Sequence, residues 1–269
     1  MTLVEKPKRN APAKQQAENA PNADDSLKSL SKVMRILEVF STIDRKLSVA
    51  EVCRRTGFPR STTHRLLASM KEVGLLDQNR QRDRYRLGLK LFELGNVVLA
   101  NLDLHREAAP YVKRLGQLTG QSVHLAIFDG RRAIVIHRAD PVESAMLLSL
   151  TESAPVHCTS VGKAILAFQP DEVIARIIEA GLQKYTANTI TSGERLREDL
   201  AVTRKRGYAI DEGEHQAGLR CCGAPIRDHE GRVFAAISVS GASWKLPTGE
   251  IASVAEIVLQ IADTISASL

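Results

Sequence analysis

The sequence has no apolar run approaching the roughly 20 residues that a helix needs to cross a bilayer, which argues against an integral membrane protein. Its first 26 residues are rich in Pro, Ala, Asn, Gln and Lys, and they lack the apolar segment of a secretory signal. We therefore expect residues 1–26 to form a disordered tail, and we expect a cytoplasmic protein with no membrane partner.

Cysteine is scarce, with four residues in 269 and no CxxC spacing. The missing spacing argues against zinc-finger and thioredoxin-like sites, and a chain of this size without a signal segment belongs in a reducing compartment. The sequence also lacks a GxSxG motif and a phosphate-binding loop, so the familiar signatures of hydrolases and nucleotide-binding enzymes are missing. The length of 269 residues suits two domains or one large domain.

Positive charge is present in excess, and it lies in one segment. Residues 27–90 carry 15 Lys and Arg against 6 Asp and Glu, a net charge of +9. Residues 91–269 carry 18 against 21, a net charge of −3. A basic segment of this kind is typical of a nucleic-acid-binding module, although a solvated basic face without a partner would carry the same charge.

The basic segment begins with two predicted helices. Apolar residues recur at helical spacing within Ser29–Ser41, namely at Leu30, Val33, Met34, Leu37 and Phe40. A short second helix follows, because Ser48 and Glu51 form a capping-box pattern and Gly57 supplies a C-terminal stop.

A third helix is predicted between Pro59, which suits a first helical turn, and Gly74, which ends the helix. Two helices joined by a tight turn that contains Gly match a DNA-binding helix-turn-helix. The third helix opens with polar and basic side chains that can contact bases or phosphates in the major groove. These candidate DNA-binding residues are Arg60, Ser61, Thr62, Thr63, His64 and Arg65.

Strand, turn and strand are expected next, in the segment LLDQNRQRDRYRLGL. Arginines at alternate positions, beginning with Arg80, share one face of this hairpin, which suits a wing that lies along the DNA backbone. The wing residues expected to contact DNA are Arg82, Arg84 and Arg86. We therefore predict a winged helix-turn-helix domain over residues 27–89, with double-stranded operator DNA as its partner.

A linker helix is expected over residues 90–106, followed by a helix that begins near Pro110. An apolar row with helical spacing runs along the linker at Leu91, Leu94, Val98 and Leu102. This row could form a dimer contact or could pack against its own domain. We favour a homodimer, because operator symmetry usually mirrors protein symmetry in such proteins.

From residue 122 the apolar period changes to two, which is typical of strands. Asp129-Gly130 and His229-Glu230-Gly231 mark hairpin turns, and a strand with a loop is expected over residues 146–158. Helices are expected at SVGKAILAF, at DEVIARIIEAG, at TSGERLREDLAVTRKRG with Thr191 as its cap, and at the C-terminus with Val254, Ile257, Val258, Ile261 and Ile265 buried. Strands in hairpins with helices around them predict an α+β domain on an antiparallel sheet over residues 107–269.

Several stretches resemble, in the right order, the IclR family of bacterial transcriptional regulators. They are FPRSTTHRLLASM, YRLGLKLFELG, HCTSVGKAILA, GLRCCGAPIRDHEGRVFAAISVSG and the closing helix, so the resemblance runs from about Ser29 to Ile265. It implies a winged helix-turn-helix domain, a linker helix and a GAF-like effector-binding domain, assembled as a dimer or a dimer of dimers. It also implies a regulator that represses or activates an operon, often one for catabolism of small carboxylates or aromatic acids, with the metabolite changing operator affinity. For this chain we expect a repressor of a catabolic operon.

An effector pocket is expected on the last strand. Alternation in RVFAAISVSG places two serine hydroxyls on one face, where they can hold a carboxylate, although strand serines often bond only within their sheet. Amides at the start of the SVGKAILAF helix also favour anions. The resemblance adds an acidic residue and a cysteine. The predicted effector-binding residues are Ser160, Val161, Gly162, Asp211, Cys221, Ser238 and Ser240.

Adjacent strand residues face opposite ways, so we place Cys221 in the pocket wall and Cys222 on the packed side. The same residues leave a redox-responsive regulator open, since either thiol could oxidise. Cys221 with His215 or His157 could also act as a nucleophile with its base, in a thiol-dependent enzyme.

A metal-responsive regulator is another alternative, with His157 and Cys158, or His215 and Cys221, as soft ligands. We favour neither a metal nor an enzyme, because no paired-ligand spacing or oxyanion signature supports them. We expect no cofactor besides the organic-acid effector. We expect a solvated turn at the polar segment DEGEH, with Glu212, Glu214 and His215 exposed to water.

Overall fold

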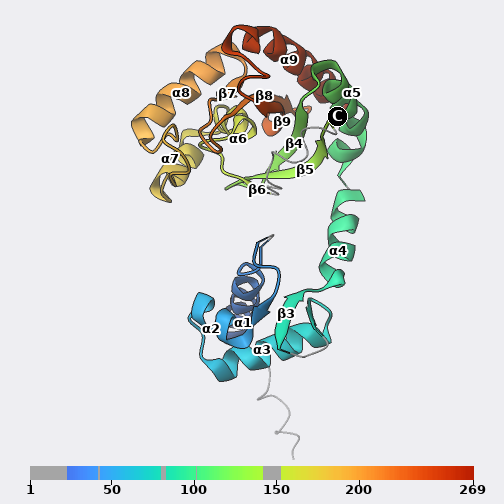
Figure 1. The fold of residues 1–269 in the computed structure, drawn as a ribbon, viewed down its shortest axis with the longest axis vertical. Coiled ribbons are helices and arrows are strands. Elements are labelled where there is room, and N and C mark those ends of the chain that lie inside the picture. Colours follow the sequence, from blue (N-terminus) through green and yellow to red (C-terminus); the bar gives the residue numbers. More distant parts are fainter. Residues whose placement is uncertain (1–22, 42, 80–82, 101, 142–152) are drawn as a thin grey trace, which may run out of the picture. The chain divides into compact units, whose positions relative to one another are not determined.

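The computed structural model describes residues 23–41, 43–79, 83–100, 102–141 and 153–269. The chain divides into two compact units, Met1–Gly95 and Asn96–Leu269 (Figure 1). Residues 1–22 of the predicted tail lie outside the described part of the chain.

Before α4 (Leu89–Ala100), the described residues of the N-terminal unit form three helices and a small antiparallel sheet with the strand order β1-β3-β2 (Figure 1). Its elements are α1 (Ala23–Leu37), β1 (Leu47–Ser48), α2 (Val49–Thr56), α3 (Arg60–Glu72), β2 (Leu76–Gln78) and β3 (Arg84–Leu87). The predicted capping box is confirmed, because the Ser48 side chain accepts from the Glu51 backbone while Glu51 accepts from the Ser48 backbone. Gly57 ends α2 with a φ of 73°, which is the left-handed conformation that favours glycine.

The first helix differs from its prediction at both ends and in its buried face. It begins at Ala23, so it takes in residues 23–26 of the predicted tail, and it ends at Leu37. Ile36 is completely buried and Val33 is half-buried, whereas Leu30 and Met34 are exposed. The helix carries more apolar residues than one core face can cover, and the packing of Ile36 decides which of them turn inward.

In the second unit the described residues form a six-stranded antiparallel sheet with the order β6-β5-β4-β9-β8-β7. Its strands are β4 (Ser122–Phe128), β5 (Ala133–Ala139), β6 (Ser153–Ala154), β7 (Ala209–Asp211), β8 (Leu219–Arg227) and β9 (Val233–Ala242). Both predicted hairpins are present, as β4 with β5 and β8 with β9. The predicted strand over residues 146–158 reduces to β6 in the described chain, since residues 142–152 lie outside it.

Helices cover both faces of this sheet (Figure 1). They are α5 (Asp103–Thr119), α6 (Ser160–Leu166), α7 (Asp171–Glu179), α8 (Gly193–Arg206) and α9 (Ile251–Ala267), with a 3₁₀ turn at Thr248–Glu250. On one face α5 and α9 share an apolar core with Val123, Leu125, Ile237 and Val239. On the other face α6, α7 and α8 pack with Ala126 and Ala236. The predicted α+β fold, with an antiparallel sheet in the second domain, is therefore confirmed.

The connection between the units consists of two helices, α4 (Leu89–Ala100) and α5, where one linker helix was predicted over residues 90–106. Helix α5 starts at Asp103, well before Pro110, which lies inside it. Pro110 removes a backbone donor, but Leu104, Ala108 and Val112 form a buried stripe that continues across it and favours an unbroken helix.

Two details of the last helices also differ from their predictions. The cap of α8 is Ser192 and not Thr191, because the Ser192 hydroxyl is the one that accepts from the Arg195 amide. On α9 the fully buried stripe includes Ala255 and Ala262, while Val254 and Ile257 are only partly buried.

Candidate DNA-binding and effector sites

The start of α3 presents a polar and basic surface. Arg60, Ser61, His64 and Arg65 are exposed and Thr62 is half-buried, so these side chains are available to a groove or a backbone of DNA. Thr63 is the exception among the predicted contacts. It is completely buried, and its hydroxyl donates to the Pro59 carbonyl at 3.1 Å, so it stabilises the start of the helix from the core side and cannot contact DNA.

The wing strand β3 places Arg84 and Arg86 on one exposed face, with buried Tyr85 between them. The Arg84 guanidinium donates to the Lys46 carbonyl at 3.1 Å and lies 3.4 Å from Glu51 Oε2. The Arg86 Nε donates to Asp77 Oδ2 at 2.9 Å. Such exposed ion pairs contribute little stability, so a phosphate can replace the carboxylate at small cost. Arg80 and Arg82 lie outside the described residues.

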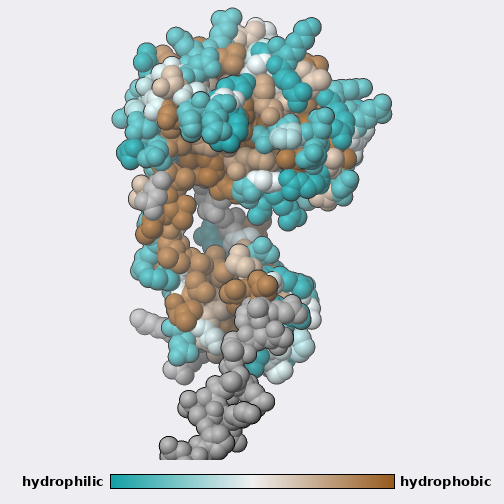
Figure 2. Space-filling view, turned by 180° about the vertical axis from the view of Figure 1, so that it is seen from behind, coloured by the Kyte–Doolittle hydropathy of each residue, from teal (hydrophilic) through white to brown (hydrophobic). Residues whose placement is uncertain are grey.

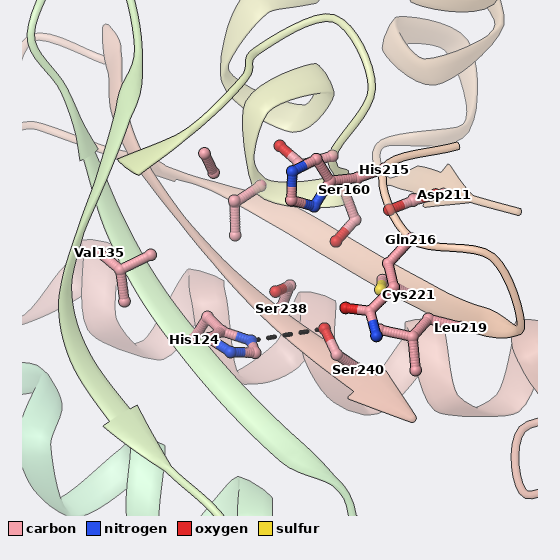
Figure 3. Close-up of a pocket in the computed structure, with 13 residues that line it drawn as sticks. His124, Val135, Ser160, Asp211, His215, Gln216, Leu219, Cys221, Ser238 and Ser240 are labelled. Carbon is pink, nitrogen blue, oxygen red and sulfur yellow. Dashed lines mark hydrogen bonds between the residues drawn. The ribbon is translucent and has the colours of Figure 1, made fainter. Parts of the chain in front are cut away.

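A cavity of about 70 Å³ lies between the sheet, helix α6 and the segment that joins β7 to β8, residues 212–218, which we name the pocket loop (Figure 3). Of the predicted effector residues it is lined by Ser160, Val161, Asp211, Cys221, Ser238 and Ser240. The structure thus brings together residues that are far apart in the sequence.

Gly162 does not line the cavity. Its amide donates to the Thr159 hydroxyl at 3.2 Å, which caps α6, so this N–H is already engaged. A Cβ at this position would lie 2.7 Å from Thr159 Oγ1, and it would also meet the backbone of Val156. Gly162 therefore allows close packing of the helix start, and the structure gives no support to the predicted effector contact through it.

Sequence reasoning missed seven further lining residues: His124, Val135, Ala154, Thr159, His215, Gln216 and Leu219. His124 pairs with Ser238 across β4 and β9 and shares its face, so strand alternation on β4 carried a signal for it (Figure 3). The pocket-loop residues carry no periodic signal. The solvated turn expected there was wrong in part, because Glu214 is buried and His215 lines the cavity.

The titratable groups in the cavity are held largely neutral. Burial lowers the pKa of His124 to about 4, so its imidazole is neutral near pH 7 and lies 3.4 Å from the Ser240 hydroxyl. Burial also raises the pKa of Asp211 to about 7, although Asp211 accepts the Glu214 amide at 2.7 Å. Among the described residues that line the cavity, none is Lys or Arg. A carboxylate would therefore be bound by hydroxyls and other neutral donors.

Cys221 and Cys222 lie on opposite sides of β8. Cys221 lines the cavity, while Cys222 packs with Leu246, Ile251 and Ala255. Both are free thiols. Burial raises the pKa of Cys221 well above its ordinary value and that of Cys222 to about 12, so neither has the thiolate character of a catalytic or redox-sensing cysteine.

The two histidines proposed as partners of these thiols both have other contacts in the structure. The His157 ring nitrogen bonds to the Gln183 carbonyl at 3.0 Å, and the Tyr185 ring contacts the rings of both His157 and His215. In the part of the chain that the structure describes, no group of three or more His, Cys, Asp and Glu is arranged to hold a metal ion. No described helix is both long enough and apolar enough to span a membrane.

Comparison with known proteins gives two family matches, described as bacterial transcriptional regulator IclR C-terminal for residues 96–267 and as IclR helix-turn-helix domain for residues 29–80. The chain is 33% identical over 246 residues to the HTH-type transcriptional regulator XynR of Escherichia coli (strain K12), covering 90% of this chain and 97% of that protein. It is 32% identical over 251 residues to the transcriptional repressor IclR of the same strain, covering 91% and 90%.

Among solved structures, an IclR homologue from Microbacterium hydrocarbonoxydans in complex with 4-hydroxybenzoate superposes with a TM-score of 0.75. The two sequences are 28% identical, and the match covers 90% of this chain and 98% of the other. The relatives are transcriptional regulators, which agrees with the expectation of a regulator and not of an enzyme.

Proposed function

The chain belongs to the IclR family of bacterial transcriptional regulators, and from that premise we propose that it represses a catabolic operon and changes its operator affinity when a small organic acid occupies the pocket. The observation that carries the proposal is the convergence of six predicted effector residues on one cavity. Residues from α6, β7, β8 and β9 contribute to it, so an occupant of the cavity contacts several elements at once.

For operator binding, the support is the exposed start of α3 together with the two described wing arginines. The test is binding of the purified protein to the intergenic DNA beside its own gene, measured by fluorescence anisotropy over a range of salt concentrations. Arg84→Ala with Arg86→Ala should weaken binding to all sequences and reduce the salt slope by about 1 for each phosphate that is no longer neutralised. The control is Lys113→Ala with Arg114→Ala, which removes two exposed basic residues from α5. If the salt dependence of operator affinity is the same in the Arg84 and Arg86 variant as in the wild type, the wing does not contact the DNA.

For the effector, the cavity chemistry favours a singly charged organic acid that also carries a hydroxyl. Two serine hydroxyls can donate to its carboxylate, and Asp211 can accept from its hydroxyl when ionised. The described lining residues supply no cation to bind a second negative charge, so such an acid would fit better than a dianion.

The effector test uses 4-hydroxybenzoate and small hydroxy and oxo acids in a thermal-shift assay. A ligand at 100 times its dissociation constant stabilises a protein by about 2.7 kcal/mol through mass action. Ser238→Ala with Ser240→Ala should remove the gain without unfolding the protein. Stabilisation that persists in this variant would place the acid outside the pocket.

A second copy of the chain is the other expected partner. Large apolar side chains are exposed on α1 at Leu27, Leu30 and Met34, and on α4 at Leu89, Phe92, Leu94, Val97 and Val98. Figure 2 shows the hydrophobic side chains gathered along α4. Exposed apolar side chains gathered along one helix, as on α4, typically mark a protein–protein contact, which supports a homodimer or a dimer of dimers.

A further inference from the structure

A second cavity, of about 380 Å³, lies in the same domain as the effector pocket but has a different lining. It is formed by the turn between β4 and β5, by β6, by the segment before α6, and by the C-terminal end of α7 with the residues after it. None of the described residues that line the effector pocket belongs to it.

Two arginines stand at this second cavity. Arg131 and Arg132 are exposed, and their guanidinium groups make no hydrogen bond or ion pair in the described chain. Their backbone amides donate to Asp129 Oδ1 at 2.8 and 2.6 Å, which fixes the turn that carries them. Arg138 of the same hairpin, by contrast, is paired with Asp140 at 2.6 Å. The positive charge of this turn therefore faces the cavity with no acidic partner among the described residues.

A buried hydroxyl group in the same lining gives a second observation. Ser153 lines the cavity, and its Oγ atom is buried with no hydrogen-bond partner among the described residues. Buried polar atoms in folded proteins are almost always hydrogen-bonded, so an orphaned hydroxyl on a residue that shares this lining with two arginines indicates a ligand that accepts hydrogen bonds.

The rest of the lining is apolar and indicates that the ligand also has an apolar part. Pro155, Val156, Ile177 and Ala180 form an apolar side, and the ring of Tyr185 borders it. An inorganic anion would leave this apolar surface without a contact. We propose that the cavity is an accessory site for a small organic anion, with its carboxylate on Arg131, Arg132 and Ser153 and its apolar frame against this wall.

The site adjoins the effector pocket through aromatic rings. The ring of His157, which lines the second cavity, lies 6.2 Å from that of Tyr185, and the Tyr185 ring lies 4.9 Å from that of His215, measured between centroids. His215 lines the effector pocket. An anion in the accessory site would therefore contact a row of rings that ends in the wall of the effector pocket.

The test is isothermal titration of benzoate and hexanoate into the full chain, with inorganic phosphate as a separate arm. Arg131→Ala with Arg132→Ala should weaken binding of the organic anions at least about tenfold, the factor that corresponds to 1.4 kcal/mol. The matched control, Lys113→Ala with Arg114→Ala, removes the same charge and should change affinity less than about twofold. Ser153→Ala keeps both cations and should weaken binding to a smaller extent.

The two sites are separated by titrating the Ser238→Ala, Ser240→Ala variant. Binding that persists there and disappears when Arg131→Ala and Arg132→Ala are added supports the accessory site, whatever the fate of the effector proposal. The accessory site is overturned if the arginine variant binds both anions like the wild type, if neither anion binds up to about 10 mM, or if phosphate binds as tightly as benzoate.

Discussion

Lys163 Nζ lies 2.5 Å from Glu214 Oε1, and the Lys163 side chain is completely buried. Asp199 Oδ2 lies 3.1 Å from the same ammonium group. Glu214 belongs to the pocket loop, and its carbonyl accepts the Thr189 hydroxyl at 2.6 Å. The two residues that follow Glu214 line the effector pocket, so this buried ion pair fixes one wall of the pocket to α6.

Breaking this ion pair should be costly. Lys163→Met leaves two carboxylates without their cation and should lower the free energy of unfolding by about 3–5 kcal/mol, as measured by urea denaturation. Adding Glu214→Leu should restore part of the loss, because the double variant buries no unpaired charge from this pair. Strictly additive losses would show that the two residues do not interact energetically.

Asp211 should make stability fall as the pH rises. Its pKa in the folded protein is about 7 against an ordinary 3.8, so the folded state holds one more proton than the unfolded state between these values. Its contribution is therefore complete below pH 3.8 and is lost as the pH rises through 7, at up to about 1.4 kcal/mol per pH unit. Asp211→Asn should flatten this part of the stability profile, whereas the exposed control Asp263→Asn should leave it in place.

His124 should act in the opposite direction. Its pKa falls from 6.5 to about 4 on folding, so the unfolded chain binds the extra proton in this interval. Stability from the neutral imidazole is complete above pH 6.5 and is lost as the pH falls towards 4. His124→Gln should reduce the acid sensitivity measured by thermal denaturation. The exposed control His229→Gln should not, and equal effects from both variants would contradict the assignment.

Thr63 and Arg65 should separate folding from DNA recognition. Thr63→Val removes a buried hydroxyl bond and should cost about 1 kcal/mol of stability while leaving operator affinity within about twofold. Arg65→Ala, at an exposed position two residues further along the helix, should weaken operator binding with little effect on stability. A specific loss of operator affinity in a fully folded Thr63→Val protein would mean that Thr63 turns outward on DNA.

The exposed row on α4 should control assembly. Leu94→Asp with Val98→Asp places charges on two exposed apolar positions and should shift the protein to monomers in sedimentation or light-scattering measurements. Val202→Asp, which changes an equally exposed apolar residue on α8, should leave the mass unchanged. If the wild-type protein is itself monomeric at micromolar concentrations in these measurements, the exposed row on α4 does not mediate assembly.

Much of the fold follows from local patterns in the sequence. The capping box at Ser48 and Glu51 and the glycine stop at Gly57 involve neighbours in the chain, so residue types alone predicted them. Strand alternation likewise placed Ser238 and Ser240 on one face, because successive strand side chains point to opposite sides whatever the sheet packs against.

Packing between distant segments determined the rest. The spacing of apolar residues on α1 is set locally, but which of them turn inward depends on the elements that cover Ile36. Lys163 and Glu214 are 51 residues apart, and nothing near either one indicates that a lysine would be buried against a pocket loop. The sequence by itself determined helices, strands and the polar face of the pocket, because those depend on local periodicity. The tertiary structure decided which polar groups are withdrawn from water and find partners, because burial is a property of the whole fold.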